Sequence, residues 1–123
     1  MSLVKSYRDL EVWQESMRTV QLVYQLTRSF PKEELYGLTS QVRRAAVSIP
    51  ANISEGQARR SRKEFQHHLS IARGSLAELE TELQIATQLQ YVKREELVPV
   101  WESCQKTGMI LNGLLRSLQS PRP

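Results

Sequence analysis

Apolar residues recur at alternating spacings of three and four along most of this chain, which is the period of an amphipathic α-helix. The pattern predicts helices at about residues 6–29, 32–55, 61–90 and 94–119. Alternation with a period of two, which is typical of strands, is scarce. Helices of similar length joined by short connections favour antiparallel neighbours, so we expect an all-α, up-down-up-down antiparallel four-helix bundle.

Each predicted helix contains one apolar stripe that we assign to the core. The stripes are Leu10, Trp13, Met17, Val20 and Tyr24; Leu35, Leu38, Val42, Ala45, Ile49 and Ile53; Phe65, Leu69, Ala72, Leu76, Leu79, Leu83 and Ala86; and Leu97, Trp101, Cys104, Gly108, Leu111, Leu115 and Leu118. Further apolar residues widen the first stripe (Val12, Val23, Leu26, Phe30) and the fourth (Val100, Ile110, Leu114). Such wide arcs exceed what one bundle core normally covers and predict self-association, and the alternative is a wide core with a few exposed leucines.

Several residues mark where the second and third helices bend, end and begin. Pro50 has no N–H to donate to the carbonyl of Ala46, so we expect the second helix to be kinked at Pro50. Gly56 is the expected end of that helix. Ser61 and Glu64 have the spacing of a capping box, which predicts the start of the third helix.

Composition favours one soluble domain spanning residues 1–123, because 40% of the residues are hydrophobic and no Gly-, Ser- or Pro-rich linker divides the chain. Charged residues near the N-terminus argue against a secretory signal. The charge-free stretch 107–115 is much shorter than the roughly 20 residues that span a bilayer, so we expect no membrane insertion. A single cysteine, Cys104, fits a reducing cytoplasm.

The net charge of +4 is unevenly distributed. Residues 41–73 contain seven basic and two acidic residues, whereas the remainder contains ten basic and eleven acidic ones. The predicted nucleic-acid-binding residues are Arg43, Arg59, Arg60, Arg62 and Lys63. Four of them flank the N-terminus of the third helix, where free N–H groups and the helix dipole also favour phosphate. A solvated surface and a protein-docking surface are the alternatives.

A polar stripe runs along the predicted second helix beside its apolar face. It consists of Gln41, Arg44, Ser48, Asn52 and Glu55, at spacings of three and four. The stripe predicts a hydrogen-bonded network between helices or between subunits, with plain exposure to solvent as the alternative.

The residues provide no complete catalytic or metal site. Glu64 and His67 form a Glu-x-x-His element, but a di-metal bundle needs two such elements, and the second histidine, His68, is adjacent to the first. On a helical wheel Glu64 and His67 point away from the apolar stripe. Cys104 lies within an apolar stripe, which predicts a buried, unreactive thiol. Without a phosphate-binding loop or a zinc-ligand spacing, we expect no enzyme, no cofactor and no bound metal.

Three segments resemble a known family of bacterial four-helix-bundle proteins encoded in intervening sequences of large-subunit ribosomal RNA genes. They are DLEVW (9–13), LYGLTSQVRRAAVSIPANISEG (35–56) and GSLAELE (74–80). The resemblance implies an up-down bundle and, through distant relatives among the accessory proteins of diversity-generating retroelements, a homopentamer. Those relatives are basic scaffolds that bind nucleic acid and a reverse transcriptase. Pro50 belongs to the family pattern, Pro99 departs from it, and no catalytic residues are implied.

The sequence therefore predicts a non-enzymatic homo-oligomer, a pentamer by resemblance, that presents a basic surface to RNA or DNA. The alternative is an oligomeric adaptor or scaffold that binds another protein and no nucleic acid.

Overall fold

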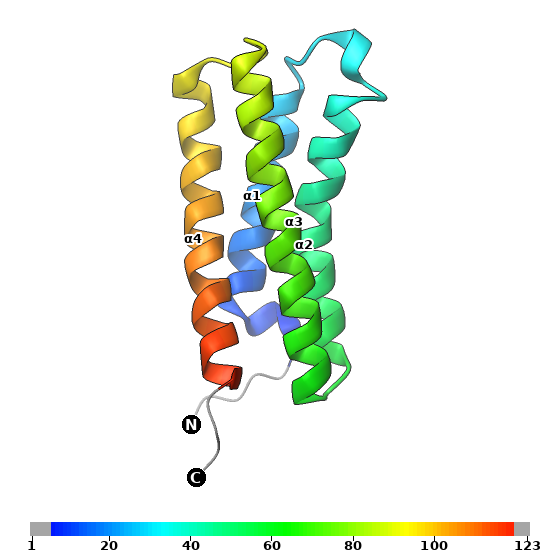
Figure 1. Ribbon diagram of the computed structural model, residues 1–123, viewed down its shortest axis with the longest axis vertical. Helices are drawn as coiled ribbons and strands as arrows, with labels where there is room; N and C mark the ends of the chain where they lie inside the picture. The colour runs from blue at the N-terminus through cyan, green and yellow to red at the C-terminus, as the bar shows by residue number, and fades with distance from the viewer. Residues whose placement is uncertain (1–5, 120–123) are drawn as a thin grey trace.

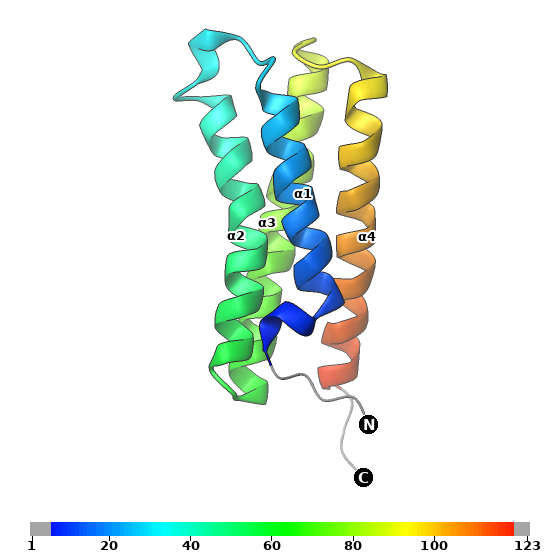
Figure 2. The same ribbon diagram turned by 180° about the vertical axis from the view of Figure 1, so that it is seen from behind.

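The computed structural model describes residues 6–119, and within that range the chain forms four α-helices and two short 3-10 helices (Figure 1). In chain order these are η1 (Tyr7–Asp9), α1 (Glu11–Thr27), η2 (Lys32–Glu34), α2 (Leu38–Ala58), α3 (Arg62–Gln88) and α4 (Arg94–Gln119). Helices α1 and α3 each pack against both α2 and α4, and consecutive helices run in opposite directions (Figures 1 and 2). The predicted all-α four-helix bundle is confirmed.

The starts of the first two helices differ from the predicted ones. Helix η1 and the extended residue Leu10 precede α1, which begins only at Glu11. Helix α2 begins at Leu38 rather than at residue 32. Glu34 explains this later start, because its carboxylate accepts the backbone N–H of Leu38 at 3.0 Å and so satisfies a free donor in the first turn. The third and fourth helices keep their predicted bounds to within two residues, although Pro99 lies inside the fourth.

Gly56 does not end the second helix, contrary to the expectation from the sequence. Helix α2 continues through Pro50 and Gly56 to Ala58, and Arg60 then adopts a left-handed backbone conformation with φ of 55°. A β-carbon placed on Gly56 would lie 2.6 Å from Cβ of His68 on α3. Glycine at this position therefore permits the close approach of α2 and α3. The kink at Pro50 stays a prediction.

The core agrees with the predicted stripes in α2 and α3, except that Leu35 lies before α2 and is exposed and that Leu38 and Phe65 are only partly buried. The buried apolar residues of these helices are Val42, Ala45, Ala46, Ile49, Ile53, Leu69, Ala72, Leu76, Leu79, Leu83 and Ala86. The assignment in α1 is wrong, because Val12, Val23 and Leu26 are buried, whereas Met17 and Tyr24 are 37% and 39% exposed. Residues that we expected to be surplus thus form the core, and part of the predicted core stripe lies on the surface.

Polar residues on the core side of α1 account for this error. The Ser103 hydroxyl of α4 donates to Oε2 of Glu15 at 2.7 Å and lies 2.6 Å from Oγ1 of Thr19. Lys106 extends over the same carboxylate, with Nζ 3.5 Å from Oε1 of Glu15. Glu15, Thr19 and Ser103 are all buried between α1 and α4. A pattern based on hydropathy places polar residues outside, whereas buried polar groups are stable here because they pair with one another.

Candidate nucleic-acid interface

Four cations lie at the turn between α2 and α3 and at the start of α3, and we call Arg59, Arg60, Arg62 and Lys63 the basic corner. The turn lies at the end of the bundle where α4 also ends (Figure 1). Ser61 starts α3 as predicted, since its hydroxyl accepts the backbone N–H of Glu64 at 3.2 Å. The left-handed conformation of Arg60 reverses the chain between the two helices. Local sequence therefore fixes these cations at one end of the molecule.

Arg59 is already paired within the chain. Its guanidinium lies 2.8 Å from Oε2 of Glu55, one helical turn earlier. The hydrogen bond from Arg59 holds the pKa of Glu55 below its usual value, and the same bond raises the pKa of Arg59. Glu55 therefore stays ionised and offsets one positive charge of the basic corner.

Arg62 connects the start of α3 to the end of α4. Its guanidinium donates to the backbone carbonyl oxygens of Leu118 and Ser117, and Nε2 of Gln66 donates to Leu118 O at 2.8 Å. Terminal carbonyls of a helix have no partner within the helix, and a cation there also interacts favourably with the helix dipole. Arg62 thus has a structural role that the sequence does not reveal.

Arg60 and Lys63 are the two cations of the basic corner that face solvent without a counter-ion among the described residues. Both are exposed. Among residues 6–119, the ion pairs within 4.0 Å involve Arg59 in this corner but neither Arg60 nor Lys63. These two side chains, beside the N-terminus of α3, are the part of the predicted site that is best placed to contact an anion.

Arg43 lies apart from the basic corner, so the structure does not bring the five predicted residues together. Its Nε donates to Oγ1 of Thr27 at 2.8 Å, and its guanidinium carbon lies 4.6 Å from the ring centroid of Tyr24. It precedes Arg59 by about 24 Å along the axis of α2. Arg43 therefore braces α1 against α2 apart from the basic corner, and its contact with nucleic acid stays a prediction.

Three members of the predicted polar stripe meet side chains of α3. Asn52 donates to the hydroxyl of Ser48 at 3.1 Å, and its Oδ1 lies 3.1 Å from Nδ1 of His68. The hydroxyls of Ser48 and Ser75 are 2.8 Å apart, and Nε2 of His68 lies 3.9 Å from Oε2 of Glu55. The contacts form a ladder of polar groups between two helices of one chain.

The other two members of the stripe, Gln41 and Arg44, are exposed and line a shallow depression of about 340 Å³ with Glu78. His68 and Ser75 were not expected as partners of the polar stripe. Their spacing of seven residues on α3, continued by Glu82, is a signal that could have found them.

The groups that could carry chemistry include one cysteine and two adjacent histidines. Cys104 is fully buried, and burial followed by the nearby charge of Glu80 raises the pKa of its thiol to about 12. His67 is exposed, as expected, with its ring edge-on to that of His68. Within the described part of the chain, no three or more His, Cys, Asp or Glu side chains are grouped so that they could hold a metal ion. None of the described helices has the length and apolarity needed to cross a bilayer.

The fold and the basic corner define an all-α four-helix-bundle protein with an uneven charge distribution. Residues 8–113 match the sequence profile of the 23S rRNA-intervening sequence protein family, and the chain belongs to that family. A crystal structure of a protein with unknown function from the S23 ribosomal protein family of Bacteroides thetaiotaomicron is similar, with a TM-score of 0.77 and 24% identity. The match covers 85% of this chain and 95% of that one and shows the shared fold. A comparison with curated proteins found no match.

Proposed function

We propose that this protein is a cytoplasmic, non-enzymatic homo-oligomer whose basic corner binds the phosphate backbone of RNA or DNA. The observation that supports this function best is the pair of exposed cations Arg60 and Lys63, which lack a carboxylate within 4.0 Å among the described residues. Arg62 adds a further positive charge, whereas the charge of Arg59 is offset by Glu55. An anion at this position would also face the N-terminus of α3, whose first N–H groups have no partner within the helix.

The exposed cations of this site favour contact with the nucleic-acid backbone over contact with bases. Arginine and lysine side chains contact phosphate oxygens in any sequence, and this contact alone supplies most non-specific binding. One subunit offers two cations that have no ion-pair partner among residues 6–119, which is a small footprint. Several copies in one assembly would multiply the number of phosphate contacts, and for that reason the proposal includes an oligomer.

The dependence of binding on salt tests the nucleic-acid part of this proposal. Displaced counter-ions make the logarithm of affinity fall linearly with the logarithm of salt concentration, by roughly 0.7 to 0.9 per phosphate contact. For Arg60→Ala combined with Lys63→Ala, we expect weaker binding and a slope smaller by roughly 1.4 to 1.8 per subunit engaged. Fluorescence anisotropy with labelled single-stranded RNA and duplex DNA would measure both.

The matched control is Arg28→Ala combined with Lys32→Ala, which removes the same charge from exposed positions at the opposite end of the bundle. Its slope should equal that of the unmodified protein. Equal losses in the two double variants would show that net charge, not the basic corner, attracts nucleic acid. No binding to either probe at low salt would exclude the proposed nucleic-acid function.

A protein-binding adaptor is the second candidate, favoured by apolar side chains in the loop between α1 and α2. Tyr36 is 94% exposed, and the neighbouring Leu35 is about half exposed. An adaptor would bind its partner with little dependence on salt, since burial of apolar surface is not screened by ions. Retention of partner binding by the Arg60→Ala and Lys63→Ala double variant, together with loss on Tyr36→Ser, would favour this alternative.

A further inference from the structure

The ladder of polar groups between α2 and α3 ends in a buried histidine, His68, beside the basic corner. Nδ1 of His68 lies 3.1 Å from Oδ1 of Asn52. The amide nitrogen of Asn52 donates to the backbone carbonyl of Ser48 at 2.9 Å and to its hydroxyl at 3.1 Å, which fixes the orientation of the amide. The hydrogen-bond network therefore makes Oδ1 of Asn52 an acceptor and places a proton on Nδ1 of His68.

The other ring nitrogen of His68 faces two carboxylates. Nε2 lies 3.9 Å from Oε2 of Glu55 on α2 and 4.0 Å from Oε1 of Glu64 on α3. In the neutral ring with its proton on Nδ1, Nε2 presents a lone pair to these two negative groups. A second proton, on Nε2, would replace the lone pair by a donor that faces both carboxylates.

Glu55 connects His68 to the basic corner. The oxygen that faces His68, Oε2, also lies 2.8 Å from the guanidinium of Arg59. The hydrogen bond from Arg59, followed by the charge of His68, lowers the pKa of Glu55, so this carboxylate stays ionised in the range where histidine side chains ordinarily gain their charge. One oxygen thus lies between a permanent cation and a ring that can become one.

The charged and titratable groups around His68 come from two helices. They are Glu55 and Arg59 of α2, and Glu64 and His67 of α3, the last with its ring edge-on to that of His68. Within residues 6–119, no ion pair within 4.0 Å joins His68 to α1 or α4. With a neutral His68 ring, one arginine lies beside two carboxylates. With a protonated ring, two cations balance the two anions.

We propose that His68 controls the basic corner: protonation of its Nε2 draws the carboxylate of Glu55 towards the ring and frees the guanidinium of Arg59 to contact a phosphate. The proton comes from solvent, and Nδ1 keeps its own proton towards Asn52. The side chains of Glu55 and Arg59 are about half exposed, so both can turn without displacing the core. This inference deepens the proposed function and rests on it, because the basic corner then binds a polyanion more tightly as pH falls.

Salt dependence measured at pH 5.5 and pH 8 tests this proposal. The probe is a labelled oligouridine RNA, whose phosphates and bases do not change charge between these values. For the unmodified protein we expect tighter binding at pH 5.5. The slope of log affinity against log salt should be larger there by roughly 0.7 per subunit engaged, since Arg59 adds one phosphate contact. Equal slopes at the two pH values would overturn the proposal.

Two variants should lose the change of slope. Arg59→Ala removes the cation that is released, and His68→Gln removes the ring, so each should keep the smaller slope at both pH values. Arg59 is exposed, and its substitution therefore tests the proposal even if His68→Gln is too unstable to fold, which circular dichroism would show. Glu55→Gln should have the larger slope at both pH values, because its Arg59 has no carboxylate to leave. A change of slope that persists in Arg59→Ala would overturn the proposal.

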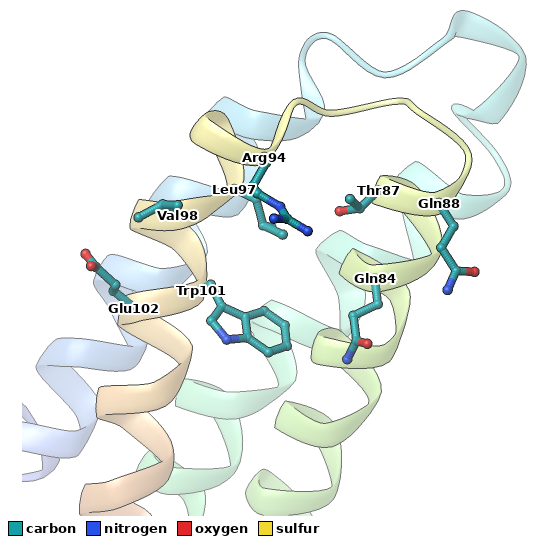
Figure 3. Close-up of a pocket in the computed structure, with 8 residues that line it drawn as sticks. All are labelled: Gln84, Thr87, Gln88, Arg94, Leu97, Val98, Trp101 and Glu102. Atoms are coloured by element: carbon teal, nitrogen blue, oxygen red, sulfur yellow. The ribbon is translucent and has the colours of Figure 1, made fainter.

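Three control variants should keep the change of slope. His67→Gln removes the adjacent, exposed histidine. Arg94→Ala removes an exposed arginine at the opposite end of the bundle, where Arg94 extends into a groove between α3 and α4 (Figure 3). Glu82→Gln removes a carboxyl whose pKa of about 7 lies within the tested range. Loss of the change of slope in any of these controls would contradict the specific role of His68.

NMR spectroscopy without nucleic acid separates this inference from the proposed function. The Nε–H resonance of Arg59 should move over the same pH range as the ring resonances of His68. If it does and no RNA binds at either pH, the exchange of partners at Glu55 is supported, whereas the proposed function and the phosphate contact of Arg59 are wrong. If RNA binds and the Arg59 resonance does not follow His68, only the control by His68 is wrong.

Discussion

Gly56 and Gly74 show how the same residue type has opposite consequences at two positions in helices. Gly56 is buried against α3, where a β-carbon would lie 2.6 Å from Cβ of His68, whereas a β-carbon on Gly74 would have nothing within 4 Å. Alanine is the better helix former by about 1 kcal/mol, but overpacking of a core typically costs about 1–3 kcal/mol. The sign of each substitution therefore depends on what surrounds the missing β-carbon.

We predict that Gly56→Ala lowers the free energy of unfolding by about 1–2 kcal/mol, because the steric cost exceeds the gain in helix propensity. Gly74→Ala should raise it by about 0.5–1 kcal/mol, since this position is open. Urea denaturation followed by circular dichroism would measure both. If Gly56→Ala raises the stability, the close approach of α2 and α3 at Gly56 is wrong.

Glu82 is a buried carboxyl whose Oε1 has no hydrogen-bond partner within the described part of the chain. Burial, followed by the charge of Glu78, raises the pKa of Glu82 from 4.5 to about 7. Between these values the folded state binds more protons than the unfolded state, so the free energy of unfolding should fall as pH rises from 4.5 through 7. The lowered pKa values of Glu34 and Glu55 act below this window, where stability is lost as pH falls.

We predict that Glu82→Gln removes this fall and leaves the variant more stable than the unmodified protein at pH 8, by on the order of 2 kcal/mol. At pH 5 the two proteins should be about equally stable. Denaturation midpoints across pH 5–8 would measure the difference, with Glu102→Gln as a control at an exposed position. An unchanged pH dependence in Glu82→Gln would show that other groups cause it.

At the scale of helices, the sequence predicts the buried faces of α2 and α3 well and that of α1 poorly. The stripes of α2 and α3 are nearly uninterrupted, so their periodicity alone identifies the buried face. In α1 two apolar faces compete, and the true core face contains Glu15 and Thr19. Their partner Ser103 lies on α4, and the pairing depends on a contact between distant segments. Periodicity within one helix cannot reveal it.

The position of the basic corner could be predicted from the local sequence, whereas the partners of its cations could not. The spacing of Ser61 and Glu64 places the start of α3, and with it the position of the neighbouring cations. Arg62 donates hydrogen bonds to carbonyl oxygens at the end of α4, more than fifty residues away in the sequence. Its role therefore depends on tertiary structure. Arg43 belongs to the same basic segment of the sequence as the basic corner, yet it lies apart from that corner in the folded chain.

For the whole molecule, net charge and local charge make different predictions about polyanion binding. The chain has a net charge of +4, and one cation of the basic corner is offset by Glu55 at 2.8 Å. Removing the charge of Glu55 changes the net charge by the same amount as removing the charge of Glu33, an exposed residue at the opposite end of the bundle. Only the first change frees Arg59 to contact phosphate.

We therefore predict that Glu55→Gln binds nucleic acid more tightly at low salt and increases the slope of log affinity against log salt by roughly 0.7 to 0.9 per subunit engaged. Glu33→Gln, the matched control, should leave the slope unchanged, because it adds no phosphate contact. Anisotropy titrations of both variants at several salt concentrations would compare them. Equal increases would mean that the overall field of the protein attracts the polyanion, whereas an increase confined to Glu55→Gln places the contact at the turn between α2 and α3.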